Sequence, residues 1–335
     1  MPGPRVHVIG TGGTIGTLGR HRLDLTEYGA FGQPILIDGL LARIPEAAQV
    51  AQVTHEQPFI EDYKTLAMGP DQWVALAQRC NELFAGDGDL SGVVITHGTN
   101  LLEETAFFLH LTVRDERPVV FTGSQRPPTG ISTDADVNLL DAIRVAASPA
   151  ARGKGALTAF NNEINSVREM AKTNTFRLET FQSPQLGLLG YADSDGKVVF
   201  YRTPTRRHTA DSEFDVAGIQ QLPQVDIVYV YGGVDGRLME ALVERGARGI
   251  VVAGSGAGGM PPAMAAVARE VAGKGVPVVL SSRTGSGRVA LTQKSAESGF
   301  VVADNLSPQK ARVLLMLGLT KTKAQAELQR MFDTY

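Results

Sequence analysis

The chain has 335 residues, of which 43% are hydrophobic, 20% charged and 6% aromatic, a composition that excludes a disordered protein. Its 32 basic and 35 acidic side chains give a formal net charge of −3 without a long run of either sign. Neither a nucleic-acid-binding stripe nor a membrane-surface patch is therefore indicated. The single cysteine excludes an internal disulfide, which fits a reducing compartment and leads us to expect a cytoplasmic protein.

Short β-branched runs recur along the chain, each followed by glycine or small polar residues and then by a segment with helical periodicity. This pattern is typical of helices packed around a mostly parallel sheet, so the sequence predicts an α/β fold. The predicted strands cover residues 6–9, 93–96, 119–122, 156–160, 225–230, 250–253 and 278–281. Fourteen of the 37 glycines lie just past these runs. Because ligands bind at the carboxyl ends of the strands in such sheets, the glycines mark the predicted functional edge.

Two segments need a choice between interpretations. Residues 71–84 place Trp73, Leu76 and Cys80 on one helical face, which predicts that Cys80 is a buried packing residue and not a reactive thiol. The uncharged stretch 249–268 has the length of a membrane span, but it contains five glycines and a Pro-Pro pair. We interpret it as a strand, a loop and the start of a helix.

The domain organisation follows from a break in this pattern. Residues 201–223 are polar and carry neither a strand nor a helix period. We interpret them as a linker between a larger N-terminal α/β domain, residues 1–200, and a smaller C-terminal α/β domain, residues 224–335.

Hydroxyl groups follow two of the predicted strands. Thr14 lies in the glycine-rich segment 9–16, and Thr99 lies in 95–100. Threonine becomes a nucleophile when a base takes its proton, and a desolvated lysine such as Lys172 can be that base. The alternative interpretations stay open at this point, because Thr14 could be a plain turn residue and Lys172 a solvated surface group.

The sequence predicts neither a metal nor an organic cofactor. The six histidines show no metal-ligand spacing. Residues 254–259 match the pattern GxGxxG after a strand, but the next strand ends in two serines and offers no acid to bind a ribose. A strand-to-helix turn is the favoured interpretation of this segment, and a dinucleotide site is the alternative.

Five segments together resemble the bacterial-type asparaginase/glutaminase family. They are TGGTIG at 11–16, VITHGTNLLEETAFFL at 94–109, AKTNTF at 171–176, YRTPTRRHTADSEFDV at 201–216 and LSPQKARVLLMLGLTKT at 306–322. The resemblance covers nearly the whole chain. It implies a flavodoxin-like or Rossmann-like N-terminal domain, a smaller C-terminal domain and a homotetramer of intimate dimers. It also implies hydrolysis of a small-molecule amide, by default L-asparagine, through a covalent acyl-threonine without a cofactor.

The resemblance assigns roles to individual residues. Thr14 matches the primary nucleophile, and Tyr28 matches the loop tyrosine that assists it. Thr99 and Lys172 match the pair that activates water or shuttles protons. Backbone N–H groups near Thr14 and in the turn around Gly98 are expected to meet the oxyanion.

Three departures from the family pattern fall on recognition of the substrate. The family's His-Gly-Thr-Asp ends here in Asn100, where the aspartate would bind the α-ammonium group. The family's Ser-Gln pair is replaced by Thr65 and Leu66, and a binding asparagine by Ala257. These changes predict either asparagine turnover or a shift to amides that lack the α-amino group or are more apolar. The lost carboxylate could be replaced by the partner subunit or by a nearby acid: Glu61, Asp62 or Glu297.

Two other functions remain as alternatives. One is a catalytically silent homologue that binds a small molecule. The other is the amidase subunit of a tRNA-dependent amidotransferase, which carries an additional N-terminal domain. We expect the hydrolase because both threonines and the lysine are present.

Overall fold

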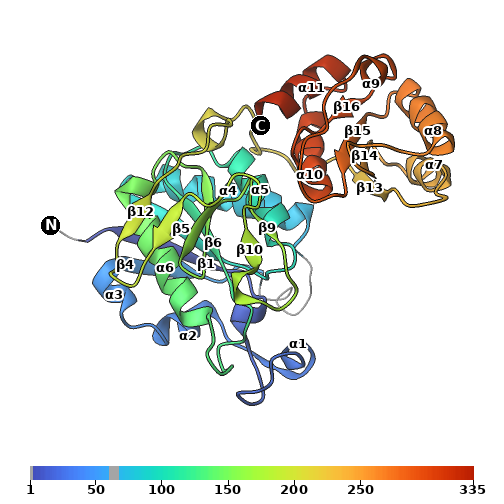
Figure 1. The fold of residues 1–335 in the computed structure, drawn as a ribbon. Coiled ribbons are helices and arrows are strands. Elements are labelled where there is room, and N and C mark those ends of the chain that lie inside the picture. Colours follow the sequence, from blue (N-terminus) through green and yellow to red (C-terminus); the bar gives the residue numbers. More distant parts are fainter. Residues whose placement is uncertain (1–2, 60–67) are drawn as a thin grey trace. The chain divides into compact units, whose positions relative to one another are not determined.

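The computed structural model describes residues 3–59 and 68–335. The chain divides into two compact units, Met1–Ala217 and Gly218–Tyr335, which run from blue to yellow and from yellow to red in Figure 1. The division falls inside the segment 201–223, and the domain bounds given above stay a prediction. Within the described ranges no helix is long and apolar enough to cross a membrane.

Unit 1 is built around an eight-stranded sheet with the order β12-β11-β8-β7-β6-β5-β1-β4. Its strands are β1 (Arg5–Gly10), β4 (Gln52–Glu56), β5 (Leu90–Thr96), β6 (Val119–Thr122), β7 (Ala156–Phe160), β8 (Glu163–Ser166), β11 (Gly190–Ala192) and β12 (Val198–Phe200). The pairs from β4 to β7 are parallel, and those from β7 to β12 are antiparallel. Two short ribbons accompany the sheet: β2 (Thr17–Leu18) with β3 (Gln33–Pro34), and β9 (Ala171–Lys172) with β10 (Phe181–Gln182).

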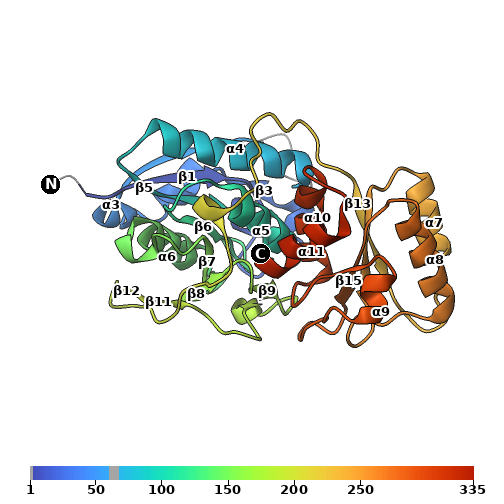
Figure 2. The same ribbon diagram turned by 90° about the horizontal axis from the view of Figure 1, so that it is seen from above.

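Helices cover both faces of this sheet, and Figure 2 shows α4 and α6 on opposite sides of it. The helices of unit 1 are α1 (Tyr28–Phe31), α2 (Ile37–Ala42), α3 (Ala47–Val50), α4 (Pro70–Gly86), α5 (Leu102–Thr112) and α6 (Ala135–Ala147). Single 3₁₀ turns are η1 (Thr14–Gly16), η3 (Pro149–Ala151), η4 (Leu178–Thr180) and η5 (Thr209–Asp211). The central strands are buried on both faces, which is why they read as continuous β-branched runs.

Helix α4 illustrates how the sequence sets an element. Pro70 occupies the first helical position, where its missing N–H costs nothing, and the Gln72 side chain accepts from the backbone N–H of Gly69 at 3.1 Å. Cys80 lies on the buried face with no exposed surface, and burial raises the pKa of its thiol. The prediction that Cys80 is a packing residue is confirmed.

Unit 2 contains a four-stranded parallel sheet of β13 (Val225–Tyr229), β14 (Gly249–Gly254), β15 (Val278–Ser282) and β16 (Val301–Val302). Its helices are α7 (Arg237–Glu244), α8 (Pro262–Gly273), α9 (Gln293–Glu297), α10 (Pro308–Leu319) and α11 (Gln325–Thr334). Helices α7 and α8 pack on one face, and α10 packs on the other. The glycine-rich segment 254–259 closes on itself through paired backbone bonds between Ser255 and Gly259, which is the predicted strand-to-helix turn. The predicted α/β fold with its smaller second domain is confirmed.

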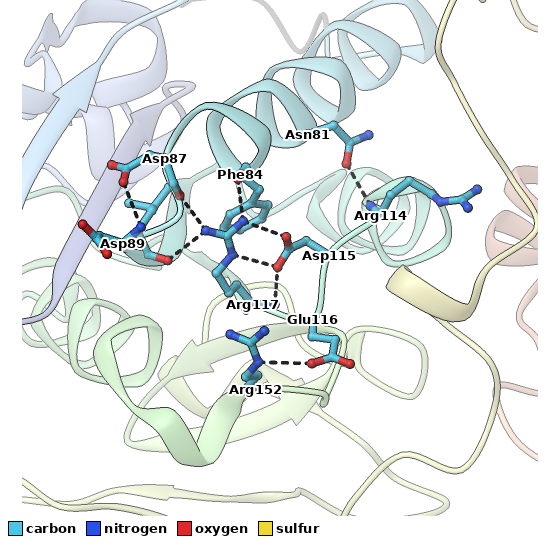
Figure 3. Close-up of polar contacts among 10 residues, drawn as sticks. Asn81, Phe84, Asp87, Asp89, Arg114, Asp115, Glu116, Arg117 and Arg152 are labelled. Carbon is cyan, nitrogen blue, oxygen red and sulfur yellow. Dashed lines mark hydrogen bonds and ion pairs between the residues drawn. The ribbon is translucent and has the colours of Figure 1, made fainter.

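Arg117 joins α4, β5 and β6 at the amino end of the large sheet (Figure 3). Its guanidinium donates to both oxygens of Asp115 and to the carbonyls of Phe84, Asp87 and Leu90. Only 10% of the side chain is exposed. These contacts satisfy carbonyls in the last turn of α4 and just after it, and they fix the turn into β5, far along the strands from their carboxyl ends.

Candidate active site

A pocket of about 340 Å³ opens where β1 and β5 end. Many of its lining groups are hydroxyls, and none of its described lining side chains is a carboxylate. The hydroxyl-bearing residues of the lining are Thr11, Thr14, Thr17, Thr26, Tyr28 and Thr99. Parallel strands bring their carboxyl ends to one edge, so segments distant in the sequence meet here.

Two glycines allow the loops after β1 and β5 to touch. Gly13 has a φ of +87°, and a Cβ at this position would lie 2.2 Å from the Cα of Gly98. Only glycine fits such a conformation and such a contact. The Thr11 backbone N–H and hydroxyl both donate to the carbonyl of Thr96, at 3.1 and 2.7 Å, and lock the first loop to the end of β5.

Thr14 forms the first polar pair of the site. It begins the 3₁₀ turn η1, and its Oγ1 lies 2.8 Å from the Oη of Tyr28. The loop between them is held by the buried carboxylate of Asp24, which accepts from the backbone and side chain of Arg20 and from the backbone N–H of Glu27. The short helix α1 then presents Tyr28 to the pocket.

Lys172 and Thr99 form the second pair. The Lys172 Nζ donates to Thr99 Oγ1 at 2.7 Å and to Asn100 Oδ1 at 3.2 Å. Burial lowers the pKa of Lys172, which favours the uncharged amine. The ribbon that carries Lys172 is tied by buried Thr180, whose carbonyl accepts from Thr173 and whose hydroxyl bonds to the backbone of Asn174.

His97 precedes this turn and lines the pocket. It is 1% exposed, and burial lowers its pKa to about 4, although the hydrogen bond to the Gly98 carbonyl acts in the opposite direction. The ring is therefore neutral near pH 7. Its Nδ1 donates to that carbonyl at 2.8 Å, so it fixes the turn and adds no charge to the site.

The structure brings most of the predicted site residues together. Thr14, Tyr28, Gly98, Thr99 and Asn100 line one pocket, and Lys172 contacts two of them. Thr65 and Leu66 lie outside the described residues, as do Glu61 and Asp62. Ala257 belongs to unit 2, in the turn between β14 and α8, and Glu297 ends α9 of the same unit.

Sequence reasoning missed several lining residues. Thr11 and Thr17 flank Thr14 at a spacing of three, and Thr26 precedes Tyr28 by two positions. The threonines repeated at a spacing of three were the sequence signal that could have pointed to these lining residues. Across residues 3–59 and 68–335, no cluster of three histidine, cysteine or acidic side chains could hold a metal ion.

The fold and these contacts define a class: a two-unit α/β protein with a threonine–tyrosine pair and a threonine–lysine pair at one strand-end pocket. The chain belongs to the asparaginase family. Residues 5–206 match the N-terminal asparaginase domain, and residues 224–332 match the glutaminase/asparaginase C-terminal domain.

Similar proteins agree with this assignment. The chain is 42% identical to L-asparaginase 2 of Bacillus subtilis, over 99% of this chain and 87% of that protein. It is 40% identical to the glutaminase-asparaginase of Pseudomonas fluorescens, over 98% and 90%. The crystal structure of a probable cytoplasmic L-asparaginase from Campylobacter jejuni superposes with a TM-score of 0.93 at 41% identity, covering 99% of this chain and all of that one. The chain is accordingly an amidohydrolase that acts on carbon–nitrogen bonds of linear amides.

Proposed function

We propose that the chain hydrolyses a side-chain or primary amide, by default that of L-asparagine, to the acid and ammonia through an ester on Thr14. The observation that carries the proposal is the pair of hydrogen-bonded groups at one pocket, Thr14 with Tyr28 and Thr99 with Lys172. The relatives named as asparaginases and glutaminase-asparaginases support the same reaction.

In the first half of the proposed reaction, Thr14 Oγ1 attacks the amide carbonyl carbon. Its proton passes to the Oη of Tyr28, which gives its own proton to the leaving nitrogen. The carbon–nitrogen bond breaks, ammonia leaves and an ester remains on Thr14. Tyr28 is neutral before and after this exchange, so no charge has to be buried.

In the second half, water cleaves the ester. When Lys172 is uncharged, the hydrogen bond to Thr99 reverses, so that the Thr99 hydroxyl gives its proton to Nζ and takes one from water. The resulting hydroxide attacks the ester carbon. The carbon–oxygen bond to Thr14 then breaks, and the proton returns to Thr14 as the acid leaves. The sum is amide plus water giving acid plus ammonia.

The proposal includes a specificity that extends to amides without an α-ammonium group. No carboxylate lines the described part of the pocket, and residue 100 is an uncharged asparagine. An ammonium group buried without a partner would have an unfavourable free energy of binding. Amides that lack this group avoid that penalty.

Ammonia release from asparagine, glutamine, succinamate and uncharged primary amides tests the proposal. We expect release from at least one of them, loss of release in Thr14→Ala, and a mass increase of the wild-type chain equal to the acyl group on rapid quenching. No release from the whole panel, or release by Thr14→Ala at the wild-type rate, would refute it.

The two alternative functions are not favoured, because the named relatives are amidohydrolases matched over both units. We further propose a cytoplasmic homo-oligomer, a dimer of intimate dimers, that takes a small-molecule amide. The cytoplasmic designation of the Campylobacter protein supports the location. Cell fractionation and native mass spectrometry test the location and the oligomeric state. In the proposed organisation, residues 201–223 link the two domains.

A further inference from the structure

Lys172 is held by two oxygen atoms from consecutive residues of one turn. Its Nζ lies 2.7 Å from Thr99 Oγ1 and 3.2 Å from Asn100 Oδ1, while its own backbone belongs to the separate ribbon β9–β10. Two acceptors fix the direction of the amine better than one, because each restricts a different rotation of the long side chain. Removing the second acceptor would leave the Nζ free to turn away from Thr99.

Both acceptors are uncharged. Within the described ranges, Lys172 takes part in no ion pair, and burial is the only cause that lowers its pKa. His97 on the same turn is neutral, and Glu179, between β9 and β10, pairs with an arginine. Glu103 and Glu104 lie in the first turn of the adjoining helix α5. Among the residues that the structure describes, the amine is therefore oriented by two uncharged acceptors and by no ion pair.

We infer that Asn100 is a positioning residue: it aims the Lys172 amine at Thr99 without stabilising the ammonium form, and so extends water activation to lower pH than a carboxylate at this position would allow. The inference rests on the proposed function, in which the uncharged amine takes the proton from Thr99. It assigns to Asn100 an effect on the second half of the reaction in addition to its place in the pocket lining.

The lower pH limit of water activation depends on whether residue 100 presents an amide dipole or a full negative charge to the amine. A carboxylate within about 4–6 Å of an amine raises the pKa of the amine by roughly 1–3 units, because it stabilises the protonated form. An amide oxygen accepts the same hydrogen bond and supplies only a partial charge. Asn100 is exposed, so water screens the added charge and we expect a shift at the lower end of that range.

The test compares Asn100→Asp with Asn174→Asp. Asn174 lies two residues after Lys172, is exposed, and accepts from the backbone N–H groups of Phe176 and Arg177, which a carboxylate also does. Both variants add one negative charge, but only Asn100→Asp places it beside the Nζ of Lys172. We measure kcat against pH at saturating substrate, so that effects on substrate binding do not enter.

We expect the acid limb of the profile to move upward by about one pH unit in Asn100→Asp and to stay in place in Asn174→Asp. In Asn100→Ala we expect a lower kcat without an upward shift, because the second acceptor is lost and no charge is added. An acid limb of Asn100→Asp that coincides with those of the wild type and Asn174→Asp would overturn the inference.

A second readout does not depend on turnover. The Lys172 side chain is titrated by NMR on protein labelled at the lysine Cε, with its signal assigned from a Lys172→Arg spectrum. Asn100→Asp should raise the titration midpoint of this signal by about one unit, and Asn174→Asp should not. An unchanged midpoint overturns the inference whether or not amides are hydrolysed, whereas absence of ammonia release with a shifted midpoint refutes only the proposed function.

Discussion

Replacing Arg117 with alanine should destabilise unit 1 severely. The guanidinium makes five hydrogen bonds, two to Asp115 at 2.8 and 2.7 Å and three to backbone carbonyls at 2.6 to 3.2 Å. It also stacks on the ring of Phe84, with 4.5 Å from Cζ to the ring centroid. Alanine would leave the half-buried Asp115 carboxylate and the carbonyls of Phe84, Asp87 and Leu90 without these donors.

The size of the expected loss in stability follows from how far the ion pair between Arg117 and Asp115 is buried. Removing one partner of a buried ion pair costs roughly 3–5 kcal/mol, because the remaining charge is left without compensation. The Asp115 side chain keeps 25% of its surface exposed, so water recovers part of that loss. We therefore expect a decrease of about 3 kcal/mol in the free energy of unfolding.

Arg152 provides the matched control in the same cluster (Figure 3). It pairs with Glu116 at 3.1 Å, but the two side chains are 58% and 59% exposed, and such a surface pair contributes about 0–1 kcal/mol. Urea unfolding is followed by fluorescence of Trp73, the only tryptophan, which is buried on α4 and reports unit 1. Equal midpoints for Arg117→Ala and Arg152→Ala would refute the reasoning.

Three further predictions concern the site and its surroundings. Tyr28→Phe should lower kcat about 100-fold with little change in KM, because it removes proton transfer and leaves the packing. Steady-state ammonia release checks this, and a kcat near that of the wild type would exclude proton transfer through Tyr28. Gly13→Ala should lower the free energy of unfolding by about 2 kcal/mol or more, because of its positive φ and its contact with the facing turn. Gly88→Ala should leave this free energy unchanged, because a Cβ there meets nothing within 4 Å. Urea unfolding midpoints of the two variants check the difference. Burial alone would raise the pKa of Asp115, but the hydrogen bonds from Arg117 outweigh it and the net pKa lies below its ordinary value. The stability from this pair is therefore present above the unfolded-state pKa and is lost as the pH falls through the folded-state pKa, so wild-type unfolding midpoints should fall more steeply in acid than those of Arg117→Ala.

The fold could be predicted wherever strands are buried on both faces. Residues 93–95 of β5 are fully buried and read as an unbroken apolar run, and the same holds for the centre of unit 2. The antiparallel part of the sheet could not be predicted, because its strands are short and β8 mixes polar with apolar residues. Strand β8 begins with Glu163 and contains Asn165, so neither hydrophobic alternation nor a β-branched run marks it.

The site was predictable in its residues but not in its contacts. Glycines after β1 and β5 pointed to Thr14 and Thr99, since backbone must approach closely there. No spacing rule relates Lys172 to Thr99, because the two residues are 73 positions apart and only the tertiary structure brings the ribbon β9–β10 to the turn after β5. The hydrogen bond from Lys172 to Asn100 is likewise a product of tertiary structure, which no local pattern encodes.

The ribbon that carries Lys172 is separate from the eight-stranded sheet whose strand ends carry both threonines. Under the proposed mechanism, the acylating half of the cycle uses no residue of this ribbon, whereas the deacylating half depends on a two-strand hairpin tied by Thr180. Warming that opens only this hairpin would stop each molecule after its first acylation, with the ester on Thr14 uncleaved. Partial denaturation would then convert a catalyst into a stoichiometric reagent before the fold is lost.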